Sequence, residues 1–230
     1  MNDLLADSGG SELPIEDGEL RWWPAIDLGG DNRDILRQLI DDCAWRQEQI
    51  TVYGKPYLQP RLSAWYGDLG YRYSGIELQP LPMPPLLLDI KARVERATGH
   101  GFNSVLLNYY RNGQDRMGMH SDDERELGPR PVIASLSLGE TRRMLFRHRR
   151  RKDLETLRLD LSCGSLLLMS GETQSHWRHG INAEKRATGA RINLTFRQIL
   201  PEYGRPASGR PASGLPASGQ LASRRRVQAG

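Results

Sequence analysis

Side chains that bind transition metals occur in two short segments of the chain. His120-Ser121-Asp122 places an imidazole and a carboxylate two residues apart, where a strand-like stretch runs into an acidic turn. The second segment holds His176 and His179, which would point to opposite faces of a strand, so only one can join the first pair. Two histidines and one carboxylate with open positions form the facial triad of non-heme Fe(II) sites, unlike a closed structural zinc site. The alternative is an acidic surface turn and a core histidine.

A strand-like segment that follows these possible metal ligands carries polar side chains along one whole face. Residues 191–197 alternate strictly, with Arg191, Asn193, Thr195 and Arg197 on one face and Ile192, Leu194 and Phe196 on the other. Two arginines inside a barrel need anionic partners, and a dicarboxylate co-substrate supplies two carboxylates that guanidinium groups bind bidentately. Asn108 and Tyr110 share another strand face and could add hydrogen bonds. An exposed edge strand explains four polar same-face positions poorly.

Together, His120-x-Asp122, His179 and Arg191-x-Asn193-x-Thr195-x-Arg197 resemble the AlkB family of Fe(II)- and 2-oxoglutarate-dependent dioxygenases, particularly its homologues specialised for double-stranded DNA. The resemblance covers roughly residues 50–200 and implies a double-stranded β-helix (jelly-roll) core. It also implies that His179 is the third ligand and His176 a neighbouring residue. The implied 2-oxoglutarate site comprises Asn108, Tyr110, Arg191, Asn193, Thr195 and Arg197, with Arg191 on the distal carboxylate.

The residues before this region mix aromatic, glycine and basic side chains, a composition that suits stacking on nucleic-acid bases at about 1–3 kcal/mol per base. A turn or core cluster of aromatics is the alternative. By the resemblance, residues 50–76 form a nucleotide-recognition lid in which Tyr53 wedges into a duplex while the damaged base is flipped out. Tyr71 and Tyr73 would line the base pocket beside His120, and Asp123 would face the base edge. The expected substrate contacts also include Gly54, Lys55, Arg61 and Arg72.

Residues 142–152 contain seven bases in eleven positions. A solvated hairpin is the usual explanation for such a run. Beside a base-flipping pocket, a loop that binds phosphates through Arg149, Arg150 and Arg151 is the better hypothesis.

The elements that would position these residues are two helices followed by many short strands. Helices are expected at about 31–44 and 84–98, and strands at 102–110, 132–138, 143–148, 156–161, 165–169, 176–181 and 190–199. This order predicts a mainly β fold with flanking helices in one domain, residues 21–203. Residues 1–20 are expected to be a disordered tail, and residues 204–230, which repeat Pro-Ala-Ser-Gly units, a flexible basic tail.

Composition limits the class of protein further. The 230 residues carry a formal net charge of +4, and no apolar run approaches the ~20 residues of a membrane span. The acidic first twenty residues are unlike a targeting peptide, so the sequence predicts a cytoplasmic monomer without membrane contact, nucleoid-associated if bacterial. The two cysteines, Cys43 and Cys163, are expected to be buried thiols.

The resemblance implies a DNA repair dioxygenase with Fe(II), 2-oxoglutarate and O2. It would oxidatively dealkylate N-alkylated bases such as 1-methyladenine and 3-methylcytosine, releasing an aldehyde, succinate and CO2. The expected partner is alkylated DNA, single- or double-stranded, and possibly RNA. Two alternatives stay open: an oxygenase that acts on RNA or protein side chains, and a non-catalytic basic nucleic-acid-binding module with a structural metal. Arg191 and Arg197 argue against the second, because a structural metal needs no dicarboxylate clamp.

Overall fold

The computed structural model describes residues 9–52, 55–73, 76–78, 80–187, 189–201 and 205–206, with the side chains of 51–52, 70–73, 76–78 and 205–206 left out. Its helices are α1 (Asn32–Asp42), α2 (Pro85–Thr98) and α3 (Thr173–His176), with a 3-10 turn at Arg125–Leu127. The strands are β1 (Ser11–Leu13), β2 (Glu19–Trp23), β3 (Gln49–Val52), β4 (Lys55–Leu58), β5 (Leu62–Gly67), β6 (Leu69–Tyr73), β7 (Ile76–Leu78), β8 (Ser104–Tyr110), β9 (Met117–His120), β10 (Ile133–Gly139), β11 (Arg142–His148), β12 (Leu157–Leu161), β13 (Leu166–Ser170), β14 (Trp177–Ile181), β15 (Arg191–Arg197) and β16 (Arg205–Pro206).

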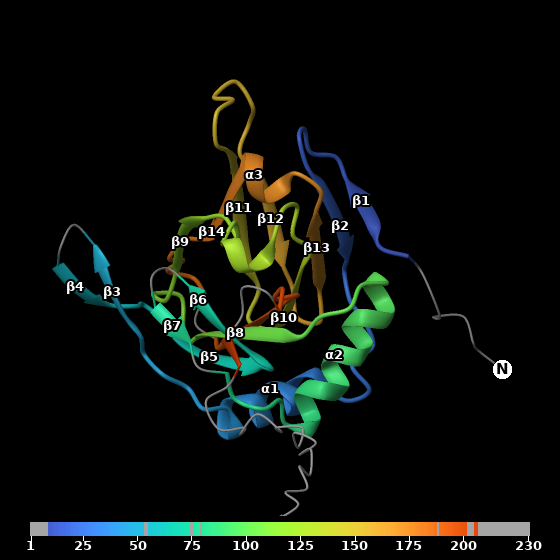
Figure 1. Ribbon diagram of the computed structural model, residues 1–230, viewed down its shortest axis with the longest axis vertical. Coiled ribbons are helices and arrows are strands. Elements are labelled where there is room, and N and C mark those ends of the chain that lie inside the picture. Colours follow the sequence, from blue (N-terminus) through green and yellow to red (C-terminus); the bar gives the residue numbers. More distant parts are fainter. Residues whose placement is uncertain are drawn as a thin grey trace, which may run out of the picture.

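Two antiparallel sheets dominate the described residues (Figure 1). The larger runs in the order β1-β2-β13-β10-β15-β8-β5, and the smaller in the order β12-β11-β14-β9. Consecutive strands such as β10 and β11 lie in different sheets, so the chain crosses between the two layers as in a jelly roll. The expected mainly β fold with flanking helices and a jelly-roll core is confirmed.

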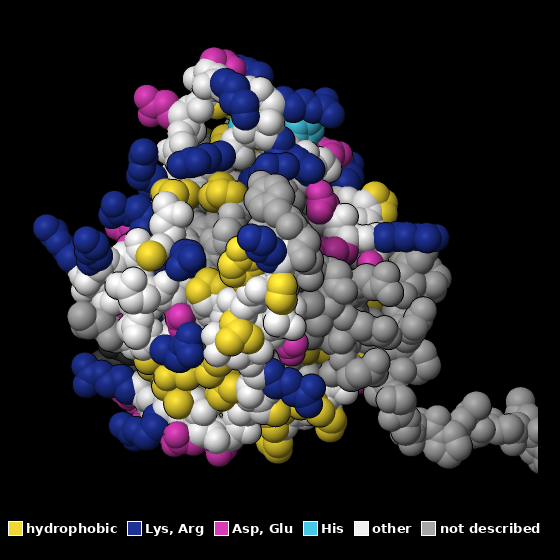
Figure 2. All heavy atoms as spheres, turned by 90° about the vertical axis from the view of Figure 1, so that its left-hand side faces the viewer, with side chains coloured by type: hydrophobic (Ala, Val, Ile, Leu, Met, Phe, Trp, Pro, Cys, Tyr) yellow, Lys and Arg dark blue, Asp and Glu magenta, His cyan; other side chains and the backbone are white. Residues whose placement is uncertain are grey.

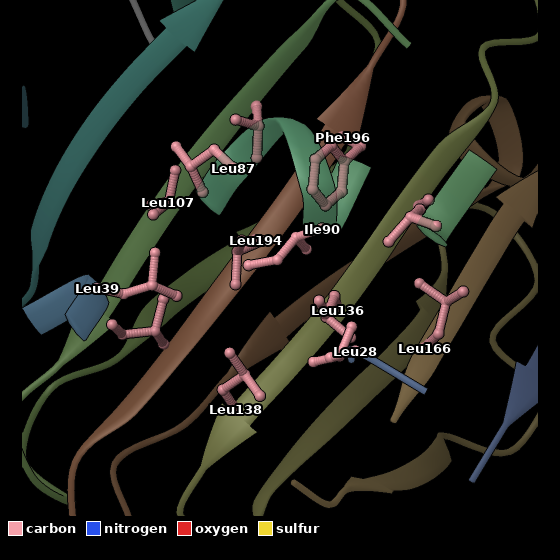
Figure 3. Packing of buried hydrophobic residues seen from close by; sticks show 14 of the residues in the cluster. Leu28, Leu39, Leu87, Ile90, Leu107, Leu136, Leu138, Leu166, Leu194 and Phe196 are labelled. Atoms are coloured by element: carbon pink, nitrogen blue, oxygen red, sulfur yellow. The ribbon is translucent and has the colours of Figure 1, made fainter. Parts of the chain in front are cut away.

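Helices α1 and α2 cover one face of the larger sheet. The Asp31 carboxylate accepts the backbone N–H of Arg33 at 2.8 Å and so caps the first turn of α1. Helix α2 starts with a proline at its first position and ends at Gly99, whose φ of +74° is a left-handed conformation that glycine adopts without strain. Apolar side chains from both helices meet those of β8, β10 and β15 in one core cluster (Figure 3), which includes Leu39, Leu87, Ile90, Leu107, Leu136, Leu194 and Phe196.

Strand β15 lies inside the larger sheet, and all seven of its residues are buried. Because successive side chains of a strand point to opposite faces, the apolar face of β15 packs under the helices and the polar face looks toward the smaller sheet. A second apolar cluster, with Trp65, Tyr110, Met144 and Phe146 among its members, fills the space around that polar face. The two clusters therefore fix β15 rigidly from both sides.

The N-terminal segment is more ordered than expected. Strand β1 pairs with β2, and β2 pairs with β13, so residues 11–13 and 19–23 belong to the larger sheet. The expectation of disorder up to residue 20 is wrong for this stretch, because Leu20 is buried and the acids find basic partners, as in the 3.1 Å ion pair of Glu16 with Arg151. Residues 1–8 lie outside the described residues, as does the repeat region beyond residue 206. Residues 205–206, which were expected to start a flexible tail, pair with β6.

None of the helices described here is both long and apolar enough to span a membrane.

Candidate metal centre and co-substrate pocket

Three possible metal ligands converge between the sheets. His120 ends β9 and His179 lies in β14, and the two residues are direct partners across these neighbouring strands, with ring centroids 4.4 Å apart. Asp122 follows two residues after His120, with its carboxylate oxygens 4.0 Å from Nε2 of His120 and 3.9 Å from Nε2 of His179. The three donor atoms lie within 4.8 Å of one another, so a single ion can contact all three.

The imidazoles of His120 and His179 can bind a metal in their neutral form. Nδ1 of His120 lies 2.9 Å from the carbonyl oxygen of Gly118, which can only accept, so this nitrogen carries the proton and Nε2 keeps its lone pair. Burial lowers the pKa of His120 below its usual value. Burial and the neighbouring His120 lower the pKa of His179 to about 3. Both rings are therefore uncharged near neutral pH, so a metal would not have to displace the additional proton of an imidazolium.

The carboxylate of Asp122 is held in its charged form. Burial is the largest single influence and opposes ionisation, but the charge and hydrogen bond of Arg197 together with the neighbouring His120 and His179 outweigh it and lower the pKa of Asp122 to about 2. Nη2 of Arg197 donates to Oδ1 of Asp122 at 2.8 Å, and the Asp122 backbone N–H donates to Oε1 of Gln174 at 2.9 Å. The second oxygen, Oδ2, is buried and has no hydrogen-bond partner among the described residues. A buried anionic oxygen left in this way fits a cation, and the two histidines with one carboxylate fit Fe(II).

The side chain of Arg191 has unused donors. It is 1% exposed, and Nη2 donates to Oγ of Ser137 at 3.0 Å. Its Nε and Nη1 have no hydrogen-bond partner in the described part of the chain. Burial lowers the pKa of Arg191, which is the physical sign that the charged guanidinium is costly where it stands. A carboxylate that accepts from Nη1 would supply both a partner for this donor and a negative charge for the buried cation, so the residues fit 2-oxoglutarate.

A hydrogen-bonded polar network connects these two sets of residues. The Asn193 amide donates to Oγ of Ser135 at 2.8 Å, and Thr195 donates to the amide oxygen of Asn193 at 3.0 Å. One cavity joins the metal ligands to this network, and its polar lining comprises Asn108, Tyr110, His120, Asp122, Ser135, His179, Asn193, Thr195 and Arg197. The cavity thus brings together all of the sequence-predicted metal and co-substrate residues except Arg191, which is not among its lining and lies against the ring of Tyr110.

Sequence reasoning missed Ser135 and Ser137, which lie on β10 opposite Thr195 and Asn193. The signal was present, because Ser135-Leu136-Ser137-Leu138 alternates like β15 and places both hydroxyls on one face. Arg61, expected among the substrate contacts, is 6% exposed and donates through Nε to the amide oxygen of Asn108 at 2.7 Å. It therefore lies at the inner wall of the site rather than on its rim.

The other expected substrate residues fall into two groups. Tyr53 and Gly54 lie outside the described residues, and Tyr71, Arg72 and Tyr73 lie on β6 without described side chains. Lys55 is exposed on β4, in a hairpin that projects from the body of the protein (Figure 1).

The basic residues of the β11–β12 connection are partly neutralised. Arg149 pairs with Asp123 at 2.8 Å, and Arg151 pairs with Asp153 at 2.6 Å. Arg150 is exposed, and its guanidinium has no ion pair within the described ranges. Figure 2 shows several Lys and Arg side chains at this top end of the molecule, with others spread over the rest of the visible face. Asp123, expected at the base edge, is therefore tied to the basic connection as well.

A second group of possible ligands, Asp17, His148 and His176, is a hydrogen-bonding cluster instead of a metal site. Nδ1 of His148 accepts the backbone N–H of Arg150 and of Arg151, at 3.2 and 2.8 Å, so the proton of the neutral ring is on Nε2. That nitrogen lies 3.3 Å from the Asp17 carboxylate. A metal there would require an imidazolate. His176 stacks near His148, with ring centroids 5.6 Å apart, and is not among the described residues that line the central cavity.

Comparisons with known proteins agree with this geometry. A family model described as the 2OG-Fe(II) oxygenase superfamily matches residues 30–197. Mouse DNA oxidative demethylase ALKBH2 is 46% identical over 174 residues, which cover 72% of this chain and 73% of that protein. Human alpha-ketoglutarate-dependent dioxygenase alkB homolog 3 is 43% identical over 176 residues, 73% of this chain. The chain spans about three fifths of the length of the human relative, 62%.

Among solved structures, one described as the structure of OsALKBH1 superposes with a TM-score of 0.58 at 18% sequence identity. The match covers 81% of this chain and 100% of that chain. At this identity the likeness bears on the fold alone.

Proposed function

Because the chain belongs to the 2OG-Fe(II) oxygenase superfamily, as a member of its AlkB family, we propose that it oxidatively dealkylates N-alkylated bases in DNA. The observation that carries the proposal is the pairing of two features in one cavity. Three metal ligands share one side of a possible ion, and a buried arginine with unused donors lies at Tyr110, which lines the same cavity. A structural metal site in a binding module would need neither open positions nor a clamp for a carboxylate.

Each group of residues has a distinct task in this reaction. When bound, Fe(II), 2-oxoglutarate and O2 supply the oxidising chemistry, and the co-substrate leaves as succinate and CO2. His120, Asp122 and His179 hold the metal, and Arg197 keeps the Asp122 carboxylate ionised and oriented. Arg191 anchors the distal carboxylate. The alkyl carbon on the base nitrogen is hydroxylated, and the resulting hemiaminal breaks down to the repaired base and an aldehyde.

Two surface features support a nucleic-acid substrate. The β3–β4 hairpin exposes Tyr57 and Leu58, which are 51% and 60% accessible, next to the exposed Lys55. An aromatic and a cation on one projecting hairpin suit stacking and phosphate contact. The β11–β12 connection adds the exposed Arg150. The relatives named DNA oxidative demethylase favour DNA over RNA or a protein side chain.

Methylated oligonucleotides should stimulate succinate production by the full chain with Fe(II) and 2-oxoglutarate. We expect stimulation by 1-methyladenine and 3-methylcytosine in DNA, with release of one aldehyde per repaired base. Unmethylated DNA of the same sequence is the control. Matched single-stranded DNA, duplex DNA and RNA show which form is preferred. If only methylated RNA stimulates succinate production, RNA and not DNA is the substrate. If none of the methylated oligonucleotides stimulates it, the proposed dealkylation is wrong.

Phosphate binding by the β11–β12 connection can be tested residue by residue. Each phosphate contact that is lost reduces the slope of log affinity against log salt by about 0.9 for duplex DNA. Arg150→Ala should show this full loss, because no acid pairs with Arg150 among the described residues. Arg151→Ala should show less, because this side chain must first leave Asp153 and Glu16. Fluorescence anisotropy over a salt series measures the slopes, and equal slopes for wild type and both variants would remove the connection from the DNA interface.

A further inference from the structure

Arg142 begins the basic run of β11 but lies inside the protein. Its side chain is 1% exposed, whereas its neighbour Arg143 is exposed and paired with Asp160 at 2.6 Å. The alternation of β11 explains the difference, because Arg142, Met144, Phe146 and His148 all point inward. A fully buried guanidinium is costly, so it needs a structural or functional reason.

Backbone oxygens satisfy the outer nitrogens of Arg142 without neutralising its charge. Nη2 donates to the carbonyl oxygens of Asp115 and Asn182, at 2.9 and 2.6 Å, and Nη1 to that of Asn112 at 3.3 Å. Arg142 forms a long ion pair with Glu184, whose Oε2 lies 3.7 Å from Nε and whose side chain is 33% exposed. The Asp115 carboxylate also interacts electrostatically with Arg142, but it is already paired with Arg111 at 2.8 Å. Nε itself has no hydrogen-bond partner among the described residues. Most of the positive charge therefore stays in the interior.

This charge lies next to the co-substrate arginine. The guanidinium carbons of Arg142 and Arg191 lie over the same ring, that of Tyr110, at 5.6 and 5.0 Å from its centroid. The two positive charges repel each other. Burial is the largest cause that lowers the pKa of Arg191, and the charge of Arg142 lowers it further. Arg142 and Arg191 share this region with the partly exposed Glu184 carboxylate and with the buried Asp115 carboxylate, which already pairs with Arg111 at 2.8 Å. This end of the site therefore carries an excess of positive charge.

We infer that Arg142 is a positioning residue of the co-substrate pocket, which holds the Tyr110 ring and makes the pocket selective for 2-oxo acids with a second carboxylate. The inference rests on the proposed function and deepens it. Arg191 binds the distal carboxylate directly, and Arg142 raises the local potential from behind Tyr110. The Glu184 carboxylate moderates that potential.

The test compares two ligands that share the 2-oxo acid end. Calorimetry with the full chain and Mn(II) in place of Fe(II) gives dissociation constants for 2-oxoglutarate and for pyruvate, which lacks the distal carboxylate. Arg142→Gln should weaken 2-oxoglutarate about tenfold, as expected for one charge at several ångströms in the interior, and leave pyruvate unchanged. Arg143→Gln is the matched control, because that side chain is the next residue and lies outside. Equal weakening of both ligands, or of neither, would overturn the inference.

A second variant does not depend on how well Arg142→Gln folds. Glu184→Gln removes the opposing charge from a partly exposed position, so 2-oxoglutarate should bind about two- to threefold more tightly relative to pyruvate. An unchanged ratio would count against a role for Arg142. Arg191→Lys distinguishes a failure of this inference from a failure of the proposed carboxylate clamp. If it lowers the ratio while the Arg142 and Glu184 variants do not, only this inference fails. If it also leaves the ratio unchanged, the proposed clamp fails.

Discussion

Replacing Asp122 with Ala is expected to abolish Fe(II) binding and turnover, with affinity for the metal falling by more than about 100-fold. Outer partners of metal sites are already worth about 10–100-fold, and Asp122 is a direct ligand. The same change removes the carboxylate of a buried, hydrogen-bonded ion pair with Arg197, which should cost about 3–5 kcal/mol of folding stability. Titration with Fe(II) under anaerobic conditions and a denaturant melt measure the two effects separately.

Two histidine variants control this prediction. His179→Ala should lose the metal to a similar extent with a smaller loss of stability, because it leaves the Asp122–Arg197 pair intact. His176→Ala should retain the metal, since His176 lies in the cluster with His148 and Asp17. Loss of iron in His176→Ala together with its retention in His179→Ala would mean that the third ligand is misassigned.

Arg191→Lys should reduce the affinity for 2-oxoglutarate by about 100-fold while leaving Fe(II) affinity unchanged. Lysine keeps the charge but loses the planar guanidinium whose Nη1 has no hydrogen-bond partner among the described residues, and a hydrogen bond between charged groups is worth about 1.5–3 kcal/mol. The dependence of succinate production on 2-oxoglutarate gives the apparent affinity. A wild-type dependence in this variant would show that the distal carboxylate binds elsewhere.

Strand β15 could be recognised from the sequence because its alternation of polar and apolar residues lies within one short segment. Seven consecutive residues of β15 alternate without exception, and the structure buries both faces. The larger helices and the later strands follow the same logic of periodicity, and their bounds differ from expectation by a few residues. One exception is His176, expected in a strand but placed in the short helix α3.

The remaining features depend on contacts that no local pattern encodes. Strands β3 to β7 were not expected, because each is only three to six residues long and offers little alternation to recognise. Arg142 was counted with the basic run of residues 142–152, although on β11 its side chain is one of those that point inward. The bond between Asp122 and Arg197 joins residues 75 positions apart, one in the loop after β9 and the other at the end of β15, and the register that creates it is a property of the folded core.

That separation sets an order of events during synthesis of the chain. The ribosome releases His120 and Asp122 long before β15, which supplies the cation that keeps the Asp122 carboxylate buried and ionised. Pairing across such distances closes slowly, because the entropy of a long loop must be overcome before the contact forms. A nascent chain that stops before residue 191 therefore holds all three metal ligands but lacks the arginine that pairs with Asp122.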